Sequence, residues 1–212
     1  MSLYIDASLA QAMRLARISL AFGRVERATR HEDGIRPETD TDHTVMLGLV
    51  ACELAPPELK RPKVAAFSLV HDIVEVYADD TQTLVISPEG LAAKKAREDA
   101  ARARITEELG AGSWLSEMLS AYEQQVEPEA RFVRLVDKIL PKLTHAFNGC
   151  CAAMTLIDRA GFIESHERQL RRLREEYPEF PGALELLAAA MRHADACWPV
   201  VDGTDASPEV NL

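Results

Sequence analysis

The sequence lacks the features of a membrane-bound, secreted or nucleic-acid-binding protein. No run of 18 apolar residues occurs, and the first twenty residues have no basic start followed by an apolar stretch. Cations are in deficit, because 24 Lys and Arg stand against 34 Asp and Glu, giving a formal net charge of -10. Such a surface repels nucleic-acid polymers and anionic membranes. We therefore expect a cytoplasmic protein with neither as a partner, in which any phosphate-bearing ligand is held by a local cation cluster or a metal.

Cysteine is scarce and its spacing excludes the common cysteine motifs. The four cysteines are Cys52, Cys150, Cys151 and Cys197, and no C-x-x-C spacing occurs among them. Neither a cysteine zinc cage nor a dithiol redox motif is supported. We expect free thiols in a reducing compartment.

Length and hydrophobic pattern predict one all-α domain. The chain has 212 residues, 47% of them hydrophobic, which suits a single globular core. Apolar residues recur at spacings of three and four, and no stretch alternates as a half-buried strand would. We expect a single-domain helical bundle over residues 1–198 and a disordered tail over 199–212. The expected helices are 6–28, 42–55, 62–78, 88–109, 112–125, 128–148, 162–176 and 181–197, with a polar loop over 30–41.

Three of the expected helices carry ionisable residues on their apolar stripes. His43 begins the stripe of the second helix, which continues through Met46, Leu47, Val50 and Leu54. His71 shares the stripe of the third helix with Phe67, Val70 and Val74, and Asp72 lies beside it. Asp137 lies between Val133, Val136 and Leu140 on the sixth. An unpaired carboxylate in an apolar interior costs several kcal/mol, so buried acids normally face a cation or hydrogen-bond donors.

These residues indicate a metal site, although each has an ordinary alternative. Two imidazoles and two carboxylates suit Mn, Co, Fe, Ni or Zn, with Mg as a further candidate. A lone histidine on an apolar face is more often a core residue with satisfied hydrogen bonds. Asp137 has possible ion-pair partners in Arg134, Lys138 and Lys142. The coincidence of a His, a His-Asp pair and an Asp on three helices favours the metal.

Three segments resemble the H…HD…D signature of the HD-domain phosphohydrolases. They are DHTVMLGLVACELA, LVHDIVEVYADDTQT and RLVDKILP, which have the order and spacing of that superfamily. The resemblance is closest to the bacterial 5'-deoxynucleotidases and covers roughly residues 10 to 145. It implies an HD-type helical bundle with one divalent metal held by His43, His71, Asp72 and Asp137. Family members often form homodimers, so a homodimer is expected by analogy.

The resemblance also implies roles for two acidic residues. Glu75 matches the residue that helps activate or orient the attacking water, and its i+4 relation to His71 puts both on one helical face. Asp80 matches the acidic position that holds the sugar hydroxyl in nucleotidases. Asp79 is a neighbouring competitor, and a capping role is open for either.

The resemblance assigns a phosphate-binding role to an arginine upstream of the first motif. Arg24, in the segment FGR, is the best match, and a rigid guanidinium fork suits both phosphate binding and stabilisation of the charge that develops during catalysis. The next residue is Val25, where the deoxynucleotidases have a tryptophan beside the sugar. Further phosphate-contact candidates are Arg27, Arg30, Lys138 and Lys142, of which Lys138 is preferred as a substrate-binding residue.

The expected activity is hydrolysis of a phosphate ester. The preferred substrate is a (deoxy)nucleoside 5'-monophosphate, which would yield nucleoside and phosphate. The first alternative is a nucleoside triphosphate or alarmone (guanosine tetraphosphate) hydrolase of the same superfamily. The second is a non-catalytic helical domain that binds a nucleotide or a protein.

Overall fold

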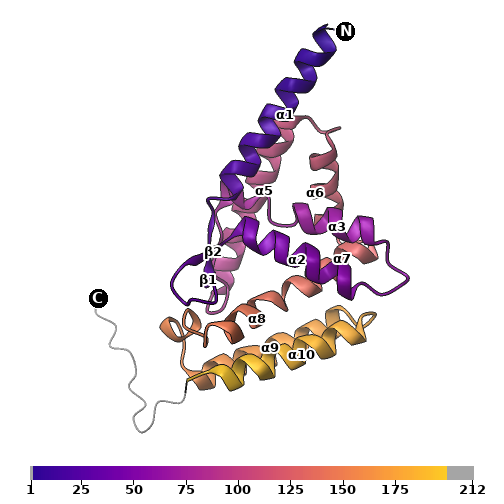
Figure 1. The fold of residues 1–212 in the computed structure, drawn as a ribbon. Coiled ribbons are helices and arrows are strands. Elements are labelled where there is room, and N and C mark those ends of the chain that lie inside the picture. The colour runs from indigo at the N-terminus through magenta and orange to yellow at the C-terminus, as the bar shows by residue number, and fades with distance from the viewer. Residues whose placement is uncertain (1, 200–212) are drawn as a thin grey trace. The chain divides into compact units, whose positions relative to one another are not determined.

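The structure, a computed structural model, describes residues 2–199 and is almost entirely helical (Figure 1). The described residues form ten α-helices, one 3-10 helix and a two-stranded sheet. The predicted all-α class is therefore confirmed. Among these helices none combines the length and apolar character required to cross a membrane. The tail expected over 199–212 lies outside the described residues except for residue 199.

The chain forms two compact units, and most helices belong to the first. This unit comprises Met1–Arg27, Thr39–Thr81 and Ile86–Arg134. Its helices are α1 (Ser2–Phe22), α2 (Asp40–Leu54), α3 (Arg61–Val70), α4 (Glu75–Ala78), α5 (Pro88–Leu109), α6 (Trp114–Gln124) and the first seven residues of α7 (Pro128–Asp137).

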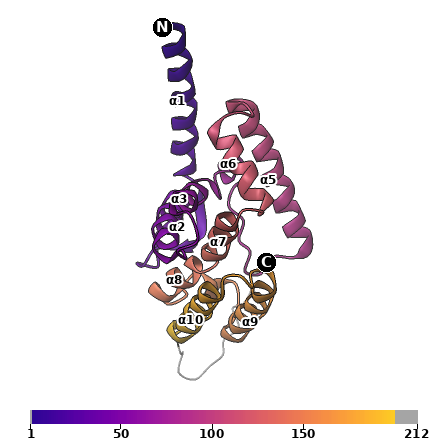
Figure 2. The same cartoon turned by 90° about the vertical axis from the view of Figure 1, so that its right-hand side faces the viewer.

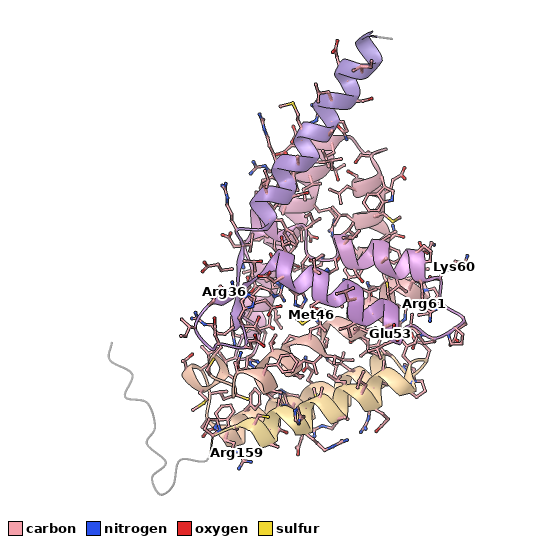
Figure 3. The ribbon with its side chains drawn as sticks, viewed as in Figure 1. Arg36, Met46, Glu53, Lys60, Arg61 and Arg159 are labelled. Carbon is pink, nitrogen blue, oxygen red and sulfur yellow. The ribbon has the colours of Figure 1, made fainter. Side chains whose placement is uncertain are left out.

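The helices α2 and α3 pack against each other and frame the core of the first unit. Leu47 of α2 and Phe67 of α3 are fully buried, and burying a side chain of this size contributes about 1.5–3 kcal/mol. The prolines after Leu54 end α2, as the sequence predicts. Arg61 then donates from Nε to the Cys52 carbonyl at 3.1 Å, and Figure 3 shows Arg61 beside Glu53 at this end of α2.

The second unit consists of residues 28–38, 82–85 and 135–199. It contains α8 (Leu140–Phe147), the 3-10 helix η1 (Ala153–Thr155), α9 (Arg159–Glu176) and α10 (Pro181–Cys197). The helices α9 and α10 lie side by side in both views (Figures 1 and 2). One cluster of its core gathers Phe162, Ala194 and Trp198 around Cys150. All four cysteines are free thiols, as expected.

Three predicted helix boundaries are wrong. The first helix ends at Phe22, and the following residues form β1 (Glu26–Arg30), which pairs with β2 (Pro37–Thr39) inside the predicted loop. The predicted helix 62–78 divides into α3 and α4, and the predicted helix 128–148 divides into α7 and α8. The last two breaks fall at His71–Val74 and at Lys138–Ile139, beside the predicted metal ligands.

Candidate metal centre

Local capping fixes the start of α2 and with it His43. The Thr39 hydroxyl accepts a hydrogen bond from the Asp42 N–H at 3.2 Å, and the Asp42 carboxylate accepts one from the Thr39 N–H at 3.1 Å. This reciprocal capping box satisfies donors that a helix start leaves without partners. Asp42 is therefore a capping residue, which agrees with its exclusion from the predicted ligands. His43 lies in the first turn and is only 1% exposed.

The break after α3 places His71, and one hydrogen bond defines its ring nitrogens. His71 Nδ1 lies 2.8 Å from the Ser68 carbonyl oxygen. Because a carbonyl oxygen only accepts, Nδ1 must carry the proton and donate. In a neutral imidazole with this tautomer, the other nitrogen, Nε2, carries the lone pair. A backbone carbonyl that fixes the tautomer in this way is the usual support of a metal-binding histidine.

His43, His71 and Asp72 converge within the first unit. One ligand atom of each lies within 4.8 Å of the others, and the two imidazole centroids are 5.4 Å apart. His71 Nε2 lies 3.0 Å from Asp72 Oδ2. A lone pair on nitrogen facing a carboxylate oxygen at this distance is repulsive unless a proton or a metal ion lies between them. The residues present therefore fit a divalent metal, which binds imidazole nitrogen and carboxylate oxygen together.

Asp137 lies at the end of α7 and belongs to the second unit. Arg134, three residues earlier, places its guanidinium 5.1 Å from the Tyr122 ring, whose centroid is 6.3 Å from that of His71. Lys138 Nζ lies 2.6 Å from Asp137 Oδ2. The ordinary ion pair considered from the sequence is thus present.

A second acidic group lies beside these residues. Carboxylate oxygens of Asp40, Asp72 and Glu75 lie within 4.8 Å of one another. Arg27 Nη1 lies 2.9 Å from Asp40, 3.0 Å from Asp72 and 3.8 Å from Glu75. Burial raises the pKa of Asp40 to about 6 although Arg27 opposes the shift. Burial, with the nearby Asp72 carboxylate, also raises the pKa of Glu75. Arg27 balances part of this negative charge, and Lys94, whose Nζ lies 3.0 Å from Glu75 Oε1, balances a further part. A divalent cation would supply more positive charge.

The remaining predicted residues occupy different surroundings. Arg24 is exposed in the turn that follows α1, whereas Arg27 reaches the acidic group. Asp79 ends α4 and donates its N–H to the Glu75 carbonyl at 2.9 Å. Asp80 is half-buried, and its negative charge acts on Asp40 and Glu75.

The sequence analysis did not identify Asp40 as a site residue. Thr39 provides the cap, and Asp40 is fully buried against Arg27.

Comparisons with known proteins agree with this geometry. The profile of the HD domain family matches residues 23–179. Among solved structures, a predicted metal-dependent phosphohydrolase from Magnetospirillum magnetotacticum aligns with a TM-score of 0.66 and 26% identity, over 88% of this chain and 94% of that chain. No curated protein matches. The family match spans most of the sequence and includes all three motifs, so the chain belongs to the HD domain family.

Proposed function

We propose that the protein is a metal-dependent hydrolase of (deoxy)nucleoside 5'-monophosphates. The observation that supports the metal is the 3.0 Å distance between His71 Nε2 and Asp72 Oδ2, which is favourable only with a proton or a cation between the two atoms. The chemistry is supported by the solved relative, itself a predicted metal-dependent phosphohydrolase. It is also supported by a buried glutamate and an arginine beside the ligand group.

Asp137 is proposed as the fourth ligand. It is 7% exposed and ends a helix that carries Arg134 against Tyr122, the neighbour of His71. Two imidazoles and two carboxylates leave coordination positions for water and substrate on an ion such as Mn, Co, Fe, Ni or Zn. Lys138, paired with Asp137, is kept as a candidate substrate contact.

Glu75 and Arg27 have different proposed roles in hydrolysis. A bound metal would supply the charge that lowers the pKa of a water and polarises the phosphate. Glu75 orients the water and accepts its proton at Oε2, a buried oxygen that accepts no hydrogen bond from a described residue. Arg27 neutralises charge that develops on the phosphate oxygens. The water oxygen bonds to phosphorus as its proton passes to Glu75, the P–O ester bond breaks, and the 5'-oxygen takes up a proton from solvent, to which Glu75 then returns its own.

The proposed substrate class rests on the acidic residue that follows this group. Asp80 is proposed to accept a hydrogen bond from a sugar hydroxyl, because its carboxylate lies close enough for its charge to act on Glu75. A monophosphate has a single phosphate group, which one arginine can contact on an otherwise acidic protein. Hydrolysis of a triphosphate or an alarmone would instead release triphosphate or pyrophosphate.

A nucleotide panel assayed with Mn, Co, Mg and Zn tests the proposal. We expect inorganic phosphate from nucleoside monophosphates. His71→Ala and Asp137→Ala should lose both bound metal and turnover. Glu75→Gln should keep its metal and lose about 10²- to 10⁴-fold in kcat, the usual contribution of a positioned acid or base. Metal content is measured by elemental analysis and product by ion chromatography.

His193→Ala is the matched control, because His193 is exposed on α10, and it should retain metal and activity. Equal metal loss in His71→Ala and Glu75→Gln would contradict the separate roles of ligand and proton acceptor. A metal-loaded wild type that binds nucleotides and releases none of the three products would favour the non-catalytic alternative.

A further inference from the structure

Lys94 of α5 reaches the proposed catalytic glutamate from a different helix. Its Nζ lies 3.0 Å from Glu75 Oε1 and 3.0 Å from Glu98 Oε1, and its side chain is 20% exposed. Glu98 lies one turn further along α5, so it holds the lysine from its own helix. The ammonium group is thereby fixed between two carboxylates, only one of which belongs to the site.

The contact makes the two oxygens of Glu75 unequal. Lys94 occupies Oε1, whereas Oε2 is buried and accepts no hydrogen bond from a described residue. Arg27 Nη1 lies 3.8 Å from Oε2, which is beyond hydrogen-bond distance. Oε2 is therefore the oxygen left to accept a proton from water, and Lys94 determines which oxygen that is.

The helix that carries Glu75 needs such external support. The helix α4 has only four residues, Glu75–Ala78, and its N-cap residue makes no side-chain cap. Arg97, three residues after Lys94 on α5, donates from Nη2 to the Thr81 hydroxyl at 2.6 Å and from Nε to the Ala78 carbonyl at 3.3 Å. One face of α5 thus holds the segment of residues 75–81 at both ends, with Lys94 on the Glu75 carboxylate and Arg97 on the Ala78 carbonyl and the Thr81 hydroxyl.

We propose that Lys94 is a positioning residue that holds Glu75 through Oε1 and so directs Oε2 toward the attacking water. This inference rests on the proposed function, because it assumes that Glu75 accepts the proton of that water. It assigns Lys94 no contact with substrate or metal. A misplacement of a reacting group by about 1 Å can cost about 100-fold in rate, which sets the scale of the effect.

The test compares Lys94→Met, Lys94→Arg and Lys95→Met in the metal-loaded full chain. Lys94→Met should lower kcat about 10- to 100-fold, with KM and metal content unchanged. Lys94→Arg should recover most of the loss, because a guanidinium can also donate to Oε1. Lys95→Met is the matched control, since Lys95 is one residue away and pairs only with Asp99 and Glu123 among the described residues. It should leave kcat unchanged.

A double-mutant cycle separates positioning from general support. In a Glu75→Gln background, Lys94→Met should lower kcat less than twofold further, because a residue that acts through Glu75 has nothing left to position. A full additional loss in the double variant would overturn the proposal. So would a parallel loss of bound metal, or an unchanged kcat in Lys94→Met of an active enzyme. Absence of turnover in the wild type with every substrate and metal would overturn the proposed function as well.

Discussion

At the scale of single residues, Arg27 is the cation that makes the acidic group tolerable. It lies within 4.0 Å of three carboxylates, one of which, on Asp40, is fully buried. Under the proposed function this arginine has two tasks, because it balances the acids in the free protein and would offer positive charge to a phosphate. Arg27 lies on β1. Arg24, the arginine predicted from the sequence, is exposed in the turn before that strand.

The two arginines predict different responses to phosphate. Arg27→Lys keeps the charge but loses the planar fork, so kcat/KM for the monophosphate should fall at least tenfold, or about 1.4 kcal/mol. The inhibition constant of inorganic phosphate should rise with it. Arg24→Lys should change both quantities by less than twofold. If Arg24→Lys weakens phosphate inhibition and Arg27→Lys does not, the phosphate contact belongs to Arg24.

The sequence indicated the proposed ligand residues, whereas it offered Arg27 only as one of several phosphate-contact candidates and did not indicate Lys94. His43, His71 and Asp72 are recognisable because an ionisable residue on an apolar stripe has few explanations, and the structure brings these three together. Arg27 and Lys94 are charged residues on polar segments, where most charges face solvent. Only the tertiary structure shows that their side chains reach Asp72 and Glu75.

At the scale of secondary structure, the helix breaks lie beside the functional residues. After Val70 the backbone changes to i to i-3 bonds, such as Glu75 N–H to the Asp72 carbonyl at 2.8 Å. No glycine or proline marks this change, so the apolar spacing predicts one helix there. The break after Asp137 has a visible cause. Pro141 has no N–H to donate to the Asp137 carbonyl four residues earlier, which ends a helix.

The capping box at the start of α2 gives a stability prediction. Thr39→Ala removes the hydroxyl that accepts the Asp42 N–H, which should lower the free energy of unfolding by about 1 kcal/mol. Thr39→Ser should retain most of that energy. Thr41→Ala, an exposed position in the same turn, is the control and should be nearly neutral. Urea unfolding of the metal-free protein measures all three, and equal losses in Thr39→Ala and Thr41→Ala would contradict the capping role.

At the scale of the whole molecule, the second unit contains buried basic side chains despite the acidic composition of the chain. Lys142 and His145 of α8 and His166 of α9 are each at most 8% exposed. His166 Nδ1 lies 2.8 Å from Asp195 Oδ1, whereas His145 Nδ1 is buried without a hydrogen bond to a described residue.

This arrangement predicts that the second unit is sensitive to acid. Burial, and then the positive charge of Lys142, lower the pKa of His145 from 6.5 to about 4, while Glu38 opposes the shift. The unfolded chain therefore takes up a proton below pH 6.5 that the folded state refuses until about pH 4. The contribution of His145 to the free energy of unfolding is fully present above pH 6.5 and is lost as the pH falls toward 4. At pH 5 the loss from His145 is about 2 kcal/mol.

Replacement of His145 should flatten that dependence. Trp198 lies in the core of the second unit, 4.9 Å from the Phe162 ring, and the only other tryptophan is Trp114. In a Trp114→Phe background, Trp198 fluorescence during urea unfolding then follows this unit.

With metal removed, the unfolding free energy of His145→Gln should fall about 2 kcal/mol less between pH 7 and pH 5 than that of the parent. The exposed control His193→Gln should follow the parent curve. Glutamine in place of His145 should lower the free energy of unfolding at every pH. The test therefore compares how much this free energy changes between pH 7 and pH 5 in each variant, and not its value at one pH. If His145→Gln and the parent lose stability in parallel, His145 is not the group that excludes the proton.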